Sequence, residues 1–169
     1  NNEKFKIFET ACFNMEKDFS YLPWMNIIRD MENELLKFNL KKPHLWDNIL
    51  KNLFFDGANN IQPSTEILEN KENFNVDLIY NSIYSALDIL SKGKKIIIVF
   101  EDIQWADQLS IKLLINLILH IHSNVLFILT KANNIDIGTD RLFLTLKDLN
   151  KILLIDLKPF SKRDIALII

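Results

Sequence analysis

Residue types that small binding and redox motifs require are scarce in this 169-residue sequence. The single cysteine, Cys12, excludes an internal disulfide and a zinc site made of several cysteines. Only three glycines are present, and none lies in a G-x-x-x-x-G-K-S/T sequence, so these residues contain no glycine-rich loop for nucleotide phosphates. The formal net charge of -2 at pH 7 gives no electrostatic reason to expect nucleic acid or an acidic membrane as a partner.

No uninterrupted apolar run is long enough to cross a membrane. Residues 113–130 contain no Asp, Glu, Lys or Arg, which approaches the length of a membrane span. Five polar side chains interrupt this run: Asn116, His120, His122, Ser123 and Asn124. Because polar groups are costly in lipid, we expect a helix, a turn and a buried strand here instead of a membrane span.

No targeting signal is visible in the sequence. A basic segment followed by an apolar one, which would mark a secretory signal peptide, is absent. The near absence of cysteine fits a reducing compartment, so we expect a cytoplasmic protein. The sequence begins at Asn1 and stops inside a predicted helix, so we expect an internal fragment of a longer protein.

Hydrophobic periodicity predicts the elements of the first 75 residues. The predicted elements are a strand over 4–13, a loop over 14–23, a helix over 24–38, a second helix between Pro43 and Gly57, and a polar loop or irregular insert over 58–75. Pro23 precedes the first helix, where proline favours helix initiation, and Gly57 ends the second.

Helices and strands alternate in the remaining residues. The predicted order is a helix over 75–93, a strand over 95–100, a helix over 107–121, a strand over 124–130, a helix over 139–150, a strand over 151–157 and a helix over 161–169. The continuous apolar run of 95–100 predicts a strand that is buried on both faces of a parallel sheet. This alternation predicts an α/β fold in which helices cover a parallel sheet.

The most informative stretch is KKIIIVFEDIQWADQLS, residues 94–110, in which an apolar strand ends on two carboxylates. Ligands of parallel α/β sheets bind outside the carboxyl ends of the strands, where Glu101 and Asp102 are expected. Adjacent carboxylates repel each other, and a bound divalent cation would relieve that repulsion. The pair therefore fits a nucleotidase that holds Mg²⁺ and orients water, and equally fits an ordinary acidic strand end.

The residues around this pair resemble a known family. IIIVFEDIQWAD, residues 96–107, resembles the Walker B segment of the STAND-class AAA+-like ATPases of bacterial transcriptional activators and multidomain signalling proteins. SYLPW at 20–24, NVLFILTKA at 124–132 and LIDLKPFSKRDI at 154–165 resemble further segments of that family in the same order. The resemblance spans residues 5–169, is strongest in 94–131 and is absent in 41–75.

The resemblance implies roles for four residues. Glu101 matches the acid linked to Mg²⁺, and Asp102 matches a second metal-associated acid that positions the attacking water and is therefore catalytic. Thr130 matches the polar residue that ends the sensor strand and contacts the nucleotide region. The family places an arginine next, where this chain has Lys131, which can supply a point charge but no bidentate contact to phosphate.

Other candidate residues have structural interpretations. We expect Asp107 to cap a helix and Trp105 to pack. His120 and His122 are two positions apart and do not share a helix face, which disfavours a zinc site. Cys12 is expected to be a small buried residue and not a nucleophile.

The resemblance implies a partial P-loop NTPase core of AAA+/STAND type over 1–169 that lacks its N-terminal phosphate-loop unit. Its parts would be a second strand and helix over 1–40, a variable helical or loop insert over 41–75, and the Walker B and sensor strands with their helices over 76–169. The whole protein would bind ATP and Mg²⁺ and switch attached sensor and effector domains, in transcriptional regulation or signal transduction.

We expect ATPase activity in the longer protein and none in this fragment, since the phosphate loop supplies most phosphate contacts. Other domains of the same chain are expected partners, homo-oligomerisation is open, and neither nucleic acid nor membrane contacts are expected from these residues. The alternative is a catalytically degenerate STAND-fold scaffold or protein-interaction module, which the missing sensor arginine favours. The Trp-Ala-Asp signature and the lack of basic clusters argue against a AAA+ machine acting on DNA.

Overall fold

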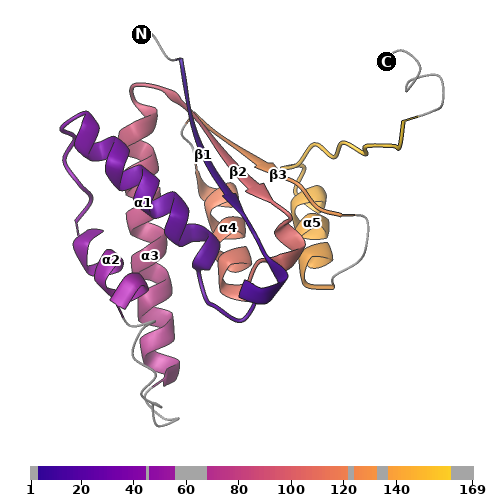
Figure 1. Cartoon of the computed structure of the whole chain (residues 1–169), viewed down its shortest axis with the longest axis horizontal. Coiled ribbons are helices and arrows are strands. Elements are labelled where there is room, and N and C mark those ends of the chain that lie inside the picture. The colour runs from indigo at the N-terminus through magenta and orange to yellow at the C-terminus, as the bar shows by residue number, and fades with distance from the viewer. Residues whose placement is uncertain (1–3, 45, 56–67, 122–123, 133–136, 161–169) are drawn as a thin grey trace.

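A computed structural model describes residues 4–44, 46–55, 68–121, 124–132 and 137–160 of the chain (Figure 1). The strands are β1 (Phe5–Ala11), β2 (Lys95–Glu101) and β3 (Val125–Leu129). The helices are α1 (Leu22–Lys37), α2 (Trp46–Phe55), α3 (Leu68–Ser91), α4 (Gln108–His120) and α5 (Ile137–Asp148), with short 3-10 helices η1 (Asn14–Glu16) and η3 (Ile103–Trp105). Among the described residues, no helix is both long enough and apolar enough to cross a membrane.

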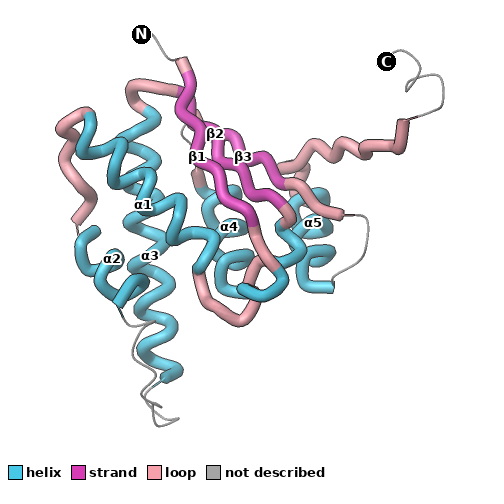
Figure 2. The backbone as a smooth tube through the Cα atoms, viewed as in Figure 1, coloured by secondary structure: helices cyan, strands magenta, loops and turns pink. Residues whose placement is uncertain are grey.

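The three strands form a parallel sheet in the order β1-β2-β3, which confirms the predicted α/β fold. Ile97 of β2 lies opposite Ile7 of β1 and opposite Leu126 of β3, so all three strands run in register. Figure 2 shows the strands side by side, and β2, the strand that ends at Glu101, is central. The carboxyl ends of all three strands therefore meet at one edge of the sheet.

One face of the sheet carries the core. Phe8, Ile96, Ile98 and Phe100 are buried on it, and the indole of Trp24 from α1 meets the Phe100 ring edge-on at a centroid distance of 4.9 Å. In Figure 1, α1, α2 and α3 group at one side of the sheet, and α4 and α5 lie together beside it. These helices bury apolar side chains at helical spacing, so packing of their amphipathic faces holds the layers together.

The opposite face of the sheet is open, and the prediction that β2 is buried on both faces was wrong. Ile7 and Leu126 on this face are each 55% exposed, and Ile97 and Val99 of β2 are only half-buried. The physical reason is that the described helices cover a single face. The apolar run of β2 correctly predicted a strand of a parallel sheet, but it could not show which of its faces a helix would reach.

An ion-pair cluster ties the amino-terminal edge of the sheet to α1. Glu34, which is buried in α1, lies 2.9 Å from Nζ of Lys6 and 3.2 Å from Nζ of Lys94. Burial alone raises the pKa of Glu34, but the hydrogen bonds from Lys6 and then Lys94 outweigh it and hold that pKa below its ordinary value. The three side chains thus connect β1, α1 and the turn before β2.

Three further predictions need correction. Part of the predicted loop 14–23 forms η1, and residues 68–75 of the predicted polar insert belong to α3, while 58–67 lie outside the described residues.

The predicted strand 151–157 is not formed: the segment is extended but pairs with no described strand, and Leu153 is 84% exposed (Figure 2). A strand exists only through hydrogen bonds to a neighbour, which an apolar run does not specify. The predicted helix 161–169 lies outside the described residues.

Candidate functional site

The acid pair lies where the central strand ends. Glu101 is the last residue of β2, is exposed, and accepts a backbone hydrogen bond of 2.9 Å from the Cys12 amide just beyond β1. Asp102 follows with a φ of 53°, in the left-handed region. Aspartate tolerates this conformation better than most residues, although it costs roughly 1 kcal/mol or more. The turn ends the strand and starts η3, which places both carboxylates at the sheet edge.

Thr130 fixes the backbone of this turn from β3. The Asp102 amide donates to Oγ1 of Thr130 at 3.1 Å, and the Ile103 amide donates to the Thr130 carbonyl at 2.9 Å. The Thr130 amide in turn donates to the Phe100 carbonyl at 2.9 Å. The side chain and backbone of one residue therefore stabilise the left-handed conformation of Asp102, and two residues that the sequence placed in the site lie in direct contact.

Gln104, which sequence reasoning did not single out, connects the acid to the segment after β3. Its Nε2 donates to Oδ1 of Asp102 at 3.1 Å, and its Oε1 accepts from the Ala132 amide at 3.2 Å. Gln104 is buried, so its amide must be hydrogen-bonded to avoid a desolvation penalty. An amide two residues after an acid, within an otherwise apolar turn, was the available signal.

Lys131 lies differently from the other predicted site residues. Its ammonium group sits 5.1 Å from the centre of the Phe143 ring in α5, a cation–π contact. The structure thus brings together Glu101, Asp102 and Thr130, and it directs Lys131 toward α5.

Asp107 and Trp105 have the structural roles that the sequence predicts. Asp107 precedes α4, and its Oδ1 accepts the Ser110 amide at 2.8 Å as a helix cap. Its Oδ2 accepts the Tyr21 amide at 3.1 Å, which anchors the loop that leads into α1. Trp105 is half-buried against the core. The indole of Trp24 adds a third link by donating to the Ser110 carbonyl at 3.1 Å.

Cys12 is buried next to this network, as the sequence predicts for a small core residue. Burial raises the pKa of its thiol to about 12, and the negative charges of Asp107, Asp102 and Glu16 contribute in the same direction. The raised pKa keeps the thiol protonated at neutral pH, which disfavours a role as a nucleophile.

The donor set at the sheet edge suits Mg²⁺ shared with a phosphate ligand. Magnesium is commonly held by one or two carboxylates together with water and phosphate oxygens, and Glu101 and Asp102 supply two exposed carboxylates. Gln104 engages one of the two Asp102 oxygens. Among the described residues, no group of three or more His, Cys, Asp or Glu residues could enclose a metal ion. The residues therefore fit a substrate-linked magnesium ion better than an all-protein metal site.

Comparison of this sequence and structure with family models, with curated proteins and with solved structures found no match.

Proposed function

We propose that this chain is part of the nucleotide-binding core of a STAND-type signalling ATPase, which binds MgATP and switches attached sensor and effector domains. The observation that carries the proposal is the acid pair at the carboxyl end of the central parallel strand, where α/β sheets bind ligands. Two hydrogen bonds support it, because they fix the position of Asp102 at that edge: the Asp102 amide donates to Thr130, and Gln104 donates to the Asp102 carboxylate.

In this proposal Glu101 and Asp102 divide two tasks. Both carboxylates would hold Mg²⁺, which would neutralise charge on the phosphates during transfer to water. Asp102 would also orient the attacking water, since its carboxylate is held on one side by the Gln104 amide. Thr130 acts on Asp102 through the backbone and so is a positioning residue. Catalysis by such an arrangement depends on position and charge more than on proton transfer.

The phosphate loop would come from another segment of the protein, upstream of these residues. The strand that precedes this loop would need to pair with a free edge of the sheet close to Asp102. β3 is an edge strand of the described sheet, and the Asp102 network ends on Thr130 and Ala132, just beyond β3. An added parallel strand beside β3 would bring its carboxyl end to the same edge of the sheet. We therefore place the loop on the β3 side.

The test uses a protein extended upstream by about 60 residues, the size of a strand-loop-helix unit that would include the loop. We expect this protein to bind MgATP, and Asp102→Asn to reduce turnover at least about 100-fold while changing the dissociation constant of ATP by less than about threefold. Asp30→Asn, at an exposed position of α1, is the matched control. Unchanged turnover in Asp102→Asn would remove the catalytic assignment, and absence of nucleotide binding would remove the proposed function.

The second candidate is a protein-interaction module that keeps the fold without hydrolysis. The exposed apolar side chains of the open sheet face, including Ile7, Leu126 and Ile128, favour it. The contact of Lys131 with Phe143, where the family has an arginine, favours it as well. This candidate predicts no nucleotide hydrolysis by the extended protein, with or without Asp102→Asn.

A further inference from the structure

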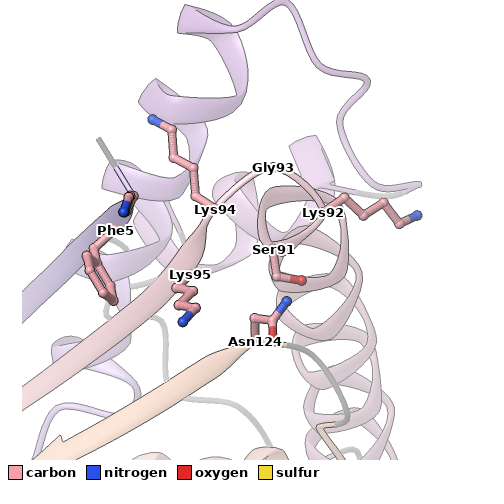
Figure 3. A pocket seen from close by; sticks show the side chains of 8 residues that line it. Phe5, Ser91, Lys92, Gly93, Lys94, Lys95 and Asn124 are labelled. Atoms are coloured by element: carbon pink, nitrogen blue, oxygen red, sulfur yellow. The ribbon is translucent and has the colours of Figure 1, made fainter. Parts of the chain in front are cut away.

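A basic hollow lies at the opposite end of β2 from the acid pair. It encloses about 310 Å³, and its lining includes Lys4, Phe5, Lys92, Lys94, Lys95 and Asn124 (Figure 3). This volume is at the lower end of the range for small-molecule sites. β2 is seven residues long, so the hollow and the acid pair are separated by about 20 Å along the strand. It is therefore a separate site.

The charges at this end do not cancel. Lys92 pairs with Asp88 at 3.2 Å, and Glu34 is shared between Lys6 and Lys94. Among the described residues, neither Lys4 nor Lys95 has a carboxylate within the 4.0 Å of a salt bridge. Among the described residues of the lining and these ion pairs, five lysines thus stand against two carboxylates, an excess of three positive charges in a chain whose formal net charge is -2. Such a local excess attracts anions.

The lining offers more than charge. Lys95 and Asn124 lie at one end of the hollow in Figure 3, whereas Lys92 and Lys94 point outward. The backbone carbonyl of Asn124 accepts from the Ile96 amide at 2.8 Å, which fixes the residue whose side-chain amide lines the hollow. Nζ of Lys95 lies 5.8 Å from the centre of the Phe5 ring, so an apolar surface adjoins the charge.

The turn at Gly93, next to the hollow, is open on the side where a side chain would stand. Gly93 is one of the lining residues, and a Cβ atom built on it would meet no other atom within 4 Å. Backbone at this turn can therefore be approached closely by a ligand.

We propose that this hollow binds a small phosphate-bearing molecule, with its phosphate at Lys95 and Asn124, its remaining part against Phe5, and Lys4 adding to the positive charge of the lining. Lysine serves as a point charge for phosphate, and an amide such as that of Asn124 can donate to a phosphate oxygen. The negative charge of the whole chain disfavours a long polyanion, so a compact ligand fits the local excess better.

The test is a titration of the 169-residue chain with inorganic pyrophosphate, followed by the amide signals of its three glycines in ¹⁵N-correlation NMR spectra. We expect a saturable shift of the Gly93 signal that weakens as salt is raised, with no saturable shift of the Gly138 signal in α5. The double variant Lys4→Gln/Lys95→Gln should raise the dissociation constant at least about tenfold. Lys112→Gln, an exposed lysine of α4 outside the hollow, should leave it unchanged.

Several outcomes would overturn the proposal. One is a Gly93 shift that does not saturate, and another is an equal shift with sodium chloride at the same ionic strength. A third is an equal loss of affinity for pyrophosphate in the double variant and in Lys112→Gln. Cosedimentation with vesicles of phosphatidylcholine containing phosphatidic acid tests a lipid headgroup as the source of phosphate. Vesicle binding that is abolished in Lys4→Gln/Lys95→Gln, without a pyrophosphate shift, would replace the small molecule by a membrane surface. An intact Gly93 response in Asp102→Asn would show that the hollow acts independently of the acid pair.

Discussion

The side-chain amide of Gln104 lies between Asp102 and Ala132, donating to Oδ1 of the first at 3.1 Å and accepting from the backbone amide of the second at 3.2 Å. The residues after β2 and after β3 are thereby joined through one buried side chain. Because the Asp102 amide also donates to Thr130, the acid at the sheet edge is held by Gln104 of η3 and by Thr130, just beyond β3. The position of this carboxylate is therefore built into the fold of the described residues.

Removing the Gln104 amide should loosen that connection. Gln104→Leu keeps the side chain's approximate volume but leaves the Ala132 amide and Oδ1 of Asp102 without this partner, so we expect a loss of about 1 kcal/mol in the free energy of unfolding. Amide hydrogen exchange of Asp102 and Ala132 should also become faster. Gln108→Leu, at an exposed position at the start of α4, is the control. Equal effects of the two variants on stability and exchange would contradict a bridging role for Gln104.

Asp107 should matter more to stability than either acid at the sheet edge. Asp107→Ala removes the cap of α4 and the carboxylate that accepts from the Tyr21 amide, and together these effects predict a loss of about 2 to 4 kcal/mol in the free energy of unfolding. Chemical denaturation measures this difference. Glu101→Ala changes an exposed side chain and should cost less than about 0.5 kcal/mol. A smaller loss for Asp107→Ala than for Glu101→Ala would show that the signature aspartate is not structural.

Glu34 should make stability depend on pH in the acidic range. The pKa of Glu34 is lowered in the folded protein from its ordinary value of 4.5, so its contribution is complete above that value and is lost as pH falls through the folded pKa. In urea denaturation at pH 7, we expect Glu34→Gln to be less stable than the parent by about 1 to 3 kcal/mol. Near pH 3 the difference in the free energy of unfolding between Glu34→Gln and the parent should become smaller. A gap that stays constant between the two pH values would exclude the ion pairs with Lys6 and Lys94 as its cause.

Cys12 should resist alkylation as long as the chain is folded. Its pKa is raised to about 12 and its side chain is buried, so almost no accessible thiolate exists at pH 8. We expect iodoacetamide to label the protein rapidly in urea and at least about 100-fold more slowly without it. Mass spectrometry follows the single adduct, because the sequence has only one cysteine. Comparable rates in the two conditions would mean that the end of β1 is open to solvent.

Local patterns predicted most of the fold, and the reason differs between elements. The β2 strand and the α4 helix follow from an apolar run and from helical spacing behind the Asp107 cap, signals contained within each segment. The start of α3 at Leu68 is not predicted, because residues 58–75 are polar and contain Pro63, although Leu, Glu and Lys in the same stretch favour helix. Residues 151–157 carry a strand-like sequence, but pairing requires a neighbour that the segment itself cannot specify.

The candidate site was predictable only where its signal lies within one segment of the sequence. Glu101 and Asp102 stand out because charges directly follow an apolar strand. The contact between Asp102 and Thr130 joins residues 28 positions apart, and parallel pairing of β2 with β3 was needed to predict it. The role of Gln104 depends on the same pairing and on burial of its amide, which the sequence alone does not reveal.

The two faces of the sheet should respond differently to the same substitution. Ile98 is fully buried on the helix-covered face, so Ile98→Thr introduces a hydroxyl and removes apolar contacts, with an expected loss of about 3 kcal/mol in the free energy of unfolding. Ile128 on the open face of β3 is 41% exposed, and threonine is also β-branched, so Ile128→Thr should cost less than about 1 kcal/mol. Urea denaturation of both variants at several protein concentrations provides the comparison. If the two variants lose the same free energy of unfolding, and the loss for Ile128→Thr grows with protein concentration, Ile128 is covered by a second copy of the chain. Equal losses at all concentrations would place Ile128 within the core and contradict the one-sided sheet.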